Sequence, residues 1–330
     1  MTCVKAWYEP FELSLQRPLQ IKGQSLTVRR GAWLYVEDEA GHVGQGEIAP
    51  LPGVSGESLE QALDQLRGVA DEGNSVDLCL DRITSGTLAP SVRCGVDMAL
   101  QILAWSSAGT PKTLEGRSVR LNGLAMGDEA ELVDHVTLLL DEGYSCIKVK
   151  VGRCPLEQDI RRIQRVQEMI AGRAMLRLDA NQAWSLDQAT RFAKEVGSDR
   201  VEYIEEPVAG RDEQVEFHRR TGMALALDES LGPSALPAHL ELTGVAALIL
   251  KPALLGSLAR VQAFMDLAAT QDIKAILSST FESAVALRFY ASLAALMNMS
   301  DQPHGLDTWR WLPGEHVADW LAIERGRICL

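Results

Sequence analysis

Five successive apolar segments of this chain each end in a charged residue. The charged ends are Lys150, Asp179, Glu205, Asp228 and Lys251. They follow one another about every 25 residues, close to the roughly 30 residues that one strand-helix step takes in a barrel of about 250 residues. Helical stretches with apolar residues at 3.6-residue spacing separate the segments. The pattern predicts a βα barrel or a doubly wound sheet with charges at one end of its parallel strands.

We expect six strands in this region, preceded by an amphipathic helix over 128–140 that Gly143 helps to end. The expected strands are Ser145–Val151, Met175–Ala180, Val201–Glu205, Met223–Asp228, Ala246–Lys251 and Lys274–Ser279. The first ninety or so residues differ, because short β-like runs are followed there by Gly-rich turns and one helix-like stretch, 58–72. That part reads as an α+β unit.

Side-chain alternation tells which way the charges point. Period two places Lys148 and Lys150 on one face of their strand and apolar residues on the other. In a barrel the apolar face packs against helices, so both lysines point inward at the carboxyl end, where barrel active sites are built. The same parity places Arg177 and Asp179 inward on the next strand.

Three acids held between two lysines would repel one another strongly unless a cation lay among them. Ligation by oxygen alone favours Mg²⁺ or Mn²⁺ over zinc. Taken singly, a Lys-x-Lys strand is usually a solvated face, and acids at strand ends commonly cap helices. The agreement of parity, strand end and spacing favours a metal site over those structural explanations.

Charge and motifs exclude several other functions. The net charge of −13 argues against nucleic acid or an anionic membrane as a partner, although a small anionic substrate remains compatible with a local cation. No dinucleotide or Walker-type glycine motif opens a helix. The six cysteines show no zinc-ligand spacing and are expected to be reduced. Without a signal-like or membrane-spanning apolar run, we expect a cytoplasmic protein.

These residues resemble the muconate lactonizing enzyme subgroup of the enolase superfamily, in which Lys-x-Lys, Asp, Glu, Asp and Lys stand on successive barrel strands. The resemblance covers nearly the whole chain, including 46–53, similar to a capping loop that closes over substrate, and 90–96, similar to the entry to the barrel. It implies an α/β fold, a modified (β/α)7β TIM-type barrel with an α+β capping domain. The implied division is a capping domain over 1–96, a catalytic barrel over 97–308 and a C-terminal segment, 309–330, that returns to the capping domain.

Within the subgroup, the strings at 176–181, 227–231, 251–258 and 305–308 are most similar to o-succinylbenzoate synthases. The resemblance implies Mg-dependent dehydration of 2-succinyl-6-hydroxy-2,4-cyclohexadiene-1-carboxylate to 2-succinylbenzoate in menaquinone biosynthesis, with Mn²⁺ as a possible substitute. The implied metal ligands are Asp179, Glu205 and Asp228. Lys150 would be the base and Lys251 the facing lysine, with Lys148 lowering the pKa of the base by like-charge proximity.

The candidate substrate contacts are polar groups near the strand ends: Lys148, Arg177, Asn181, Ser278, Ser279 and Glu282. Polar residues in this region also have structural alternatives. Arg177 can equally be the partner of a supporting acid, and Thr280 and Ser283 in the same polar run can simply cap the following helix. A monomer is expected.

Two other functions stay open at this stage. The same lysines and metal could run a 1,1-proton transfer, as in N-succinylamino acid racemase or dipeptide epimerase. A barrel that has lost catalysis and only binds is a different class, and the complete set of lysines and acids speaks against it.

Overall fold

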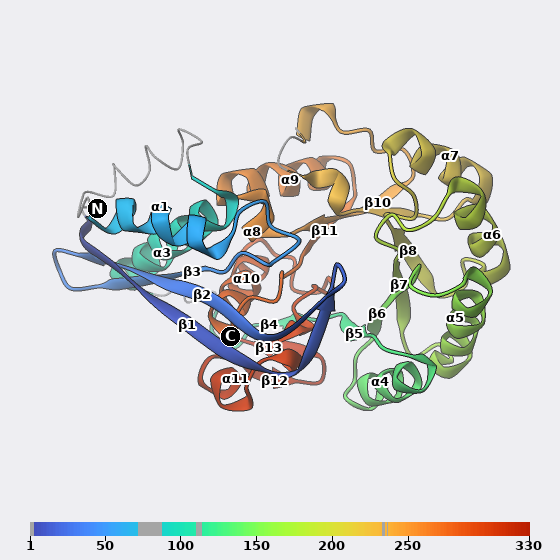
Figure 1. The fold of residues 1–330 in the computed structure, drawn as a ribbon, viewed down its shortest axis with the longest axis horizontal. Helices are drawn as coiled ribbons and strands as arrows, with labels where there is room; N and C mark the ends of the chain where they lie inside the picture. Colours follow the sequence, from blue (N-terminus) through green and yellow to red (C-terminus); the bar gives the residue numbers. More distant parts are fainter. Residues whose placement is uncertain (1–2, 72–87, 110–113, 233–234, 236) are drawn as a thin grey trace.

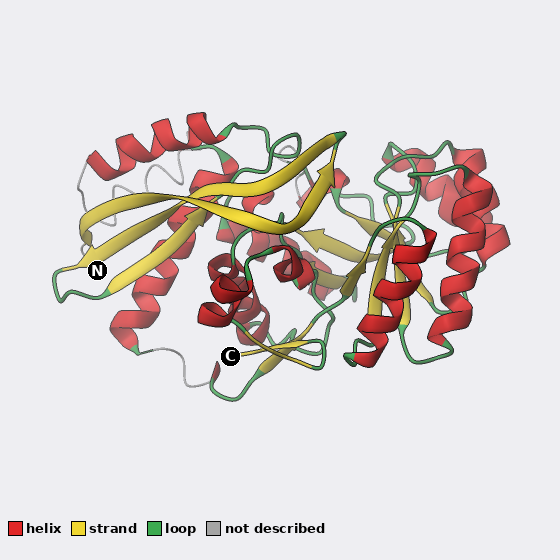
Figure 2. Cartoon of the chain, turned by 60° about the horizontal axis from the view of Figure 1, so that its bottom comes forward, coloured by secondary structure: helices red, strands yellow, loops and turns green. Residues whose placement is uncertain are grey.

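The computed structural model describes residues 3–71, 88–109, 114–232, 235 and 237–330. An antiparallel sheet with its helices lies beside a barrel of parallel strands (Figure 1). The antiparallel part comprises β1 (Cys3–Ile21), β2 (Gln24–Asp38), β3 (Val43–Ile48), α1 (Leu59–Asp71) and α3 (Pro90–Ala108). Figure 2 shows that β1 and β2 form a long twisted ribbon whose tip reaches toward the barrel.

The antiparallel part has its own apolar core. On β2 the alternating residues Ala32, Leu34 and Val36 are fully buried and pack with residues of α1 and α3. The approach of β3 to α3 is very close, because a Cβ added at Gly46 would lie 1.9 Å from the Gly95 carbonyl oxygen. Only glycine fits there, so this pair of glycines fixes the helix against the sheet.

The barrel contains seven parallel strands in the order β11-β10-β9-β8-β7-β6-β5. The strands are β5 (Gly123–Ala125), β6 (Cys146–Lys150), β7 (Met175–Asp179), β8 (Val201–Glu205), β9 (Leu225–Leu227), β10 (Val245–Leu250) and β11 (Lys274–Leu277). The six strands expected from the sequence therefore match β6 to β11 to within two residues at each end. The α/β fold with a capping domain is confirmed.

Helices cover the outside of the barrel, and 3₁₀ turns follow some of the strands (Figure 1). The helices are α4 (Glu129–Asp141), α5 (Leu156–Ile170), α6 (Leu186–Val196), α7 (Arg211–Thr221), α8 (Pro252–Leu255), α9 (Leu258–Thr270) and α10 (Ala284–Leu296), and the turns are η2 (Glu229–Leu231) and η3 (Pro237–His239). The expected helix over 128–140 is α4, which begins after a capping box made by Asp128 and Glu131.

A single segment closes the barrel between its first and last strands. The amide of Gly305 donates to the Leu277 carbonyl of β11 (2.8 Å), and the amide of Asn122 donates to the His304 carbonyl (2.9 Å). Residues 304 and 305 thus bridge β11 to the chain just before β5 in parallel fashion. This closure brings the carboxyl ends of all the strands around one opening.

His304 at this seam is fully buried and neutral. Its Nδ1 accepts from the Leu277 amide (3.0 Å), and its Nε2 lies 3.1 Å from the Met299 carbonyl, to which it donates. Burial lowers the pKa of His304 to about 4. The unfolded chain takes up this proton at a higher pH than the folded protein does. The contribution of His304 to the free energy of unfolding is therefore fully present above the ordinary pKa of about 6.5 and is lost as pH falls toward 4.

We expect His304 to contribute about 2 kcal/mol to the fall in unfolding free energy between about pH 7 and about pH 5. Urea unfolding of wild type and His304→Gln, compared between about pH 7 and about pH 5, measures it. The variant should lose much of the pH dependence, because glutamine does not titrate. His239→Gln, at an exposed site, is the control and should behave as wild type. Equal pH dependence in His304→Gln and wild type would contradict the assignment.

The C-terminal segment divides between the two parts of the molecule. After η4 (Asp307–Trp311) and α11 (Gly314–Trp320), β12 (Ala322–Glu324) pairs with β13 (Arg327–Cys329), and β13 pairs with β4 (Ser118–Arg120). The segment contacts the capping domain where the Gln16 side chain donates to the Leu312 carbonyl (2.7 Å) and where His316 stacks on Trp33 with ring centroids 6.1 Å apart. The expected division into a capping domain, a barrel and a C-terminal segment that returns to the capping domain stays a prediction.

Two further expectations concern cysteines and membranes. Among the described side chains, Cys94, Cys146, Cys154 and Cys329 are free thiols; the Cys3 side chain and Cys79 lie outside the described set. Within the described part of the chain, none of the helices has both the length and the apolar character needed to cross a bilayer.

Candidate active site

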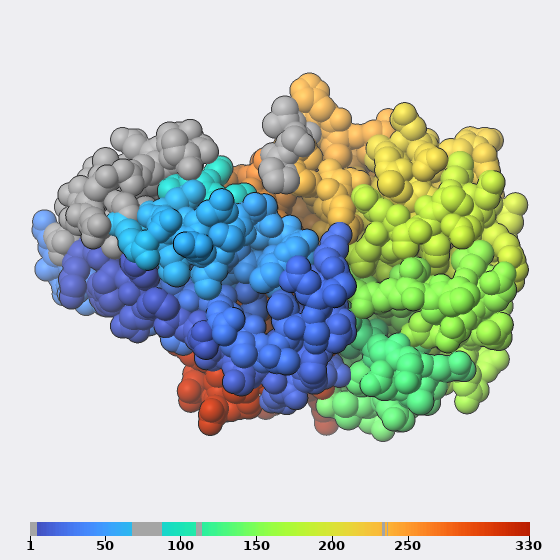
Figure 3. All heavy atoms as spheres, in the orientation of Figure 1, coloured from blue at the N-terminus to red at the C-terminus, as the bar shows by residue number. Residues whose placement is uncertain are grey.

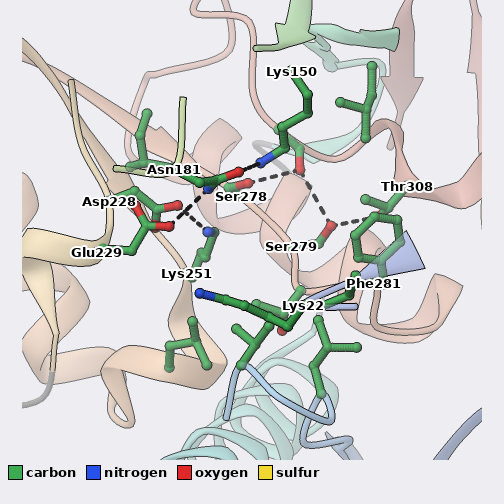
Figure 4. Close-up of a pocket in the computed structure, with 18 of the residues that line it drawn as sticks. Lys22, Lys150, Asn181, Asp228, Glu229, Lys251, Ser278, Ser279, Phe281 and Thr308 are labelled. Carbon is green, nitrogen blue, oxygen red and sulfur yellow. Dashed lines mark hydrogen bonds and ion pairs between the residues drawn. The ribbon is translucent and has the colours of Figure 1, made fainter. Parts of the chain in front are cut away.

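A cavity of about 570 Å³ lies at the carboxyl ends of the barrel strands, beneath loops of the capping domain (Figure 4). The barrel contributes lysines and acids on one side and a polar run, 278–281, on another. The capping domain contributes the tip of the β1–β2 hairpin and the loop after β3. In Figure 3 the dark blue atoms of the hairpin abut the green side of the barrel. Such an enclosed cavity with a few convergent polar groups is typical of a small-molecule site.

The strand register brings the charged strand ends together. Lys150 of β6 is level with Asp179 of β7, and Asp179 is level with Glu205 of β8. Asp228 and Lys251 follow immediately after β9 and β10. All five charged ends predicted from the sequence therefore stand at one mouth of the barrel, with their apolar neighbours packed outward against the helices.

Ion pairs link the lysines to the acids. The Lys148 Nζ lies 2.6 Å from Glu205 Oε2 and 2.7 Å from Asp179 Oδ2. The Lys150 Nζ donates to the same Asp179 oxygen (2.5 Å) and to Asn181 Oδ1 (2.8 Å). Lys251 pairs with Asp228. Lys150 and Lys251 enter the cavity from opposite directions and point toward one another in the view of Figure 4.

Burial and crowding shift the proton affinities of these groups. Burial alone would lower the pKa of Lys148, but Asp179 and Glu205 outweigh it and raise that pKa well above its ordinary value. For Lys150, burial is the largest effect and lowers the pKa, and the neighbouring ammonium of Lys148 lowers it further. Together they outweigh the charge of Asp179, which raises it. Burial and the charge of Asp179 raise the pKa of Glu205. Lys150 is thus the lysine of this pair that loses its proton more readily.

The acids fit a divalent metal ion in their chemistry. Among the described residues no three His, Cys, Asp or Glu side chains are arranged to hold a metal ion, and the ammonium of Lys148 lies between the carboxylates of Asp179 and Glu205. Nevertheless Asp179 Oδ2 and Glu205 Oε2 lie within 2.7 Å of one nitrogen, Lys148 Nζ, so their oxygens already converge on a single cationic point. Both are fully buried, and Asp228 is 7% exposed. Carboxylate oxygens are the ligands that Mg²⁺ and Mn²⁺ prefer.

Glu206 supports this arrangement and escaped the sequence interpretation. It is fully buried, and its Oε1 accepts from the amides of Asp228 (3.0 Å) and Ser230 (2.8 Å). Its Oε2 accepts from Gln182 (2.9 Å) and Gln214 (2.7 Å). Glu206 therefore holds the loop that carries Asp228. The sequence signal was present, because a second acid directly follows Glu205.

The polar run after β11 lies across the cavity from the acids (Figure 4). Ser278 and Ser279 line the cavity as expected, and the Ser279 hydroxyl lies 2.6 Å from that of Thr308. Asn181 also lines it, with its backbone at φ 44° and its amide nitrogen donating to Glu229 (2.9 Å). These side chains are available to a bound ligand.

Arg177 and Glu282 do not line the cavity, and their assignment as substrate contacts stays a prediction. Arg177 faces inward but sits one layer below the mouth, where Glu202 (2.6 Å) and Asn122 (2.9 Å) bind it. The alternation of side chains correctly predicted that Arg177 points into the barrel. Its position along the strand, two residues before Asp179, places it below the cavity. The Glu282 carboxylate turns away and accepts from the Thr280 hydroxyl (2.6 Å).

A buried clamp joins the capping domain to the polar run. Arg29 donates to the carbonyls of Phe281 (2.9 Å) and Pro50 (2.9 Å) and is 1% exposed. Glu47 accepts from the Ser283 amide (2.7 Å) and hydroxyl (2.6 Å), at the start of α10. Burial raises the pKa of Glu47 to about 7. The hydroxyl of Ser283 also caps α10 through the Val285 amide. No sequence pattern points to Arg29, because its partners are backbone carbonyls.

Comparisons with known proteins agree with this fold. Residues 131–330 match the family model described as "Enolase C-terminal domain-like", and residues 4–103 match "MenC, N-terminal domain". The fold and its ring of lysines and acids define a member of the enolase superfamily. The chain is 34% identical over 317 residues to the o-succinylbenzoate synthase of Citrobacter koseri, covering 94% of this chain and 92% of that protein. The chain belongs to the o-succinylbenzoate synthase family.

Other relatives are consistent with this membership. The o-succinylbenzoate synthase of Proteus mirabilis is 33% identical, with 95% of this chain and 93% of that protein covered. Among solved structures, MenC from Desulfotalea psychrophila superimposes with a TM-score of 0.80 at 22% identity, covering 99% and 100% of the two chains. The L-Ala-D/L-Glu epimerase of Bacillus subtilis gives 0.86 at 18% identity, covering 100% and 96%. At these identities the structures support the fold alone.

Proposed function

We propose that this chain catalyses the dehydration of 2-succinyl-6-hydroxy-2,4-cyclohexadiene-1-carboxylate to 2-succinylbenzoate, a step of menaquinone biosynthesis. Identity of 34% to an o-succinylbenzoate synthase along nearly the whole chain supports the activity. The observation that carries the chemistry is the convergence of Lys150 and Lys251 on one cavity beside three buried acids. The carbon next to a carboxylate is only weakly acidic. A lysine base to take its proton and positive charge to stabilise the resulting anion would make that proton removable.

Asp179, Glu205 and Asp228 would hold a divalent cation, which membership of the enolase superfamily implies; we propose Mg²⁺, with Mn²⁺ as a substitute. When bound, the cation supplies positive charge for the carboxylate whose neighbouring carbon loses a proton. Metal binding requires the ammonium of Lys148 to give up its position between Asp179 and Glu205. Lys148 can then serve the substrate carboxylate or moderate the charge beside Lys150.

Lys150 is the proposed base. It takes the proton from the ring carbon that bears the carboxylate, and its lowered pKa makes the neutral amine accessible. Asn181 holds the Nζ through its side-chain oxygen. The carbon-oxygen bond to the ring hydroxyl then breaks, and the proton on Lys150 leaves with that hydroxyl as water. The third ring double bond forms in this step, so aromatisation drives the elimination.

Lys251 enters the cavity from the other side and provides a positive charge over the opposite face of the ring. Apolar side chains surround the space where the ring would lie and exclude water from it. They include Leu19, Ile21, Leu51, Val54, Met126, Ile249, Leu254 and Phe281. Ser278 and Ser279 are the proposed hydrogen-bonding partners of the succinyl group.

A 1,1-proton transfer is the second candidate function, because one lysine on each face of a substrate can remove and return a proton. Fold similarity to dipeptide epimerases is compatible with it. The purified protein should therefore be assayed with the cyclohexadiene acid, with N-succinylamino acids and with dipeptides. We expect 2-succinylbenzoate with concomitant loss of water. Fast racemisation or epimerisation with no 2-succinylbenzoate would overturn the proposal.

We further propose a cytoplasmic monomer that takes a small carboxylate substrate and neither nucleic acid nor a membrane as a partner. The acidic composition supports the exclusion of nucleic acid. Gel filtration of the full chain tests the monomer. A non-catalytic binding barrel is less compatible with the retention of both lysines and all three acids.

A further inference from the structure

The tip of the β1–β2 hairpin holds a lysine in an unfavourable backbone conformation. Ile21 pairs with Gln24, so Lys22 and Gly23 form a two-residue turn. Both have positive φ, 47° for Lys22 and 77° for Gly23. Two-residue hairpin turns of this kind favour asparagine or glycine at the first position, and a longer side chain there costs about 1 kcal/mol. A lysine at this position calls for a role that offsets the strain.

The turn directs Lys22 across the cavity. Lys22 lines the cavity together with Leu19 and Ile21 of the same hairpin. Its stem lies beside Gly53 of the loop after β3, where an added Cβ would meet the Lys22 Cβ at 3.4 Å. In Figure 4 the side chain extends from the side of Phe281, and its amine points toward the side of Lys251.

Lys22 also differs from the other cavity lysines in its partners. Lys148, Lys150 and Lys251 each pair with an acid of the barrel. In the described part of the chain, no carboxylate oxygen lies within the 4.0 Å ion-pair limit of Lys22. Arg153, on the loop after β6, is the other cavity-lining cation of the described residues without such a pair. Lys22 is therefore an exposed positive charge that lines the cavity from the capping domain and that no described carboxylate pairs with.

We infer that Lys22 binds the second carboxylate of a dianionic substrate, the one on the flexible side chain. This rests on the proposed function, in which the ring carboxylate occupies the acid and lysine end of the cavity. The succinyl carboxylate is separated from it by several bonds and can extend from the barrel toward the capping domain. Lys22 approaches from the capping domain and can meet this group, so the hairpin recognises the substrate as well as covering it. An amine paired to a carboxylate strengthens binding by about tenfold to hundredfold.

The experiment compares two ligands that differ only in this charge. Calorimetry in Mg²⁺ buffer measures binding of 2-succinylbenzoate and of its monomethyl ester at the aliphatic carboxylate. We expect wild type to prefer the diacid by about tenfold or more, and Lys22→Gln to bind both about equally. Lys22→Arg should keep most of the preference. Lys194→Gln, at an exposed site on α6, is the charge-matched control and should keep all of it.

Turnover provides a second readout. Lys22→Gln should raise KM for the cyclohexadiene acid by about tenfold and change kcat by less than about threefold, because Lys22 contacts no reacting atom. The inference would be overturned if Lys22→Gln kept the full preference for the diacid, or if wild type showed no such preference. It would also be overturned if the preference were lost in Arg153→Gln and kept in Lys22→Gln. Failure of wild type to form 2-succinylbenzoate would overturn the proposed function alone, since the binding comparison needs no turnover.

Discussion

Replacing Lys150 with alanine should lower kcat for dehydration by at least about 10²-fold to 10⁴-fold, the range that a positioned proton acceptor contributes. Lys150 is the lysine at the cavity whose pKa burial and Lys148 lower, and its amine is held by Asp179 and Asn181. The alanine variant lacks any group in that place to accept the proton. Initial rates of 2-succinylbenzoate formation, followed by absorbance, measure the loss.

The fold of Lys150→Ala should be retained, because Asp179 keeps its pairing with Lys148. Its urea midpoint and its binding of Mg²⁺ serve as checks on the variant protein. Lys194→Ala, on the outer surface of α6, is the matched control and should turn over as wild type. Turnover of Lys150→Ala within tenfold of wild type would show that another group removes the proton.

Removing divalent metal should have an effect of similar size. Chelation is expected to lower activity by about 10³-fold or more, and Mg²⁺ should restore it, since positive charge beside the substrate carboxylate contributes several kcal/mol to lowering the barrier. A readout independent of activity is calorimetric titration of the chelated protein with Mg²⁺, where we expect one site. Activity that persists after exhaustive chelation would contradict the metal site.

Variants locate that metal site. Asp179→Asn should abolish the calorimetric Mg²⁺ signal, because Asp179 is fully buried and its oxygen already meets the cation of Lys148. Asp212→Asn, at an exposed acid of α7, removes the same charge elsewhere and should leave Mg²⁺ binding unchanged. Normal binding in Asp179→Asn would remove this carboxylate from the ligand set.

Much of the barrel and of its charged mouth was predictable from the sequence. Strand parity predicted that Lys148 and Lys150 share a face, and the register with β7 agrees. Repeat spacing predicted that Asp228 and Lys251 follow neighbouring strands. Both signals are local, because period two and the length of a strand-helix step are properties of a few tens of residues. Because folding does not change such local patterns, the predicted side-chain faces and strand ends agree with the structure.

Depth and long-range contacts were not predictable in the same way. Arg177 has the parity of Asp179 but lies two residues nearer the amino end of β7, and that places it beneath the cavity. Glu206 acquires its role from Gln182, Gln214 and the loop after β9. Arg29 donates to the backbone carbonyl of Phe281, which is 252 residues away in the sequence. No short sequence window contains such partners.

The sequence by itself determined the βα alternation, the inward face of each strand and the chemical kind of the site, because side-chain periodicity and residue type act over short distances. Only the tertiary structure decided which inward residues reach the cavity, how the lysines partner the acids, and that Lys22 of the capping domain crosses the cavity mouth. These depend on barrel closure at His304 and Gly305 and on the packing of the hairpin over the strand ends. Such packing joins segments far apart in the chain, so its geometry exists only once the whole chain has folded.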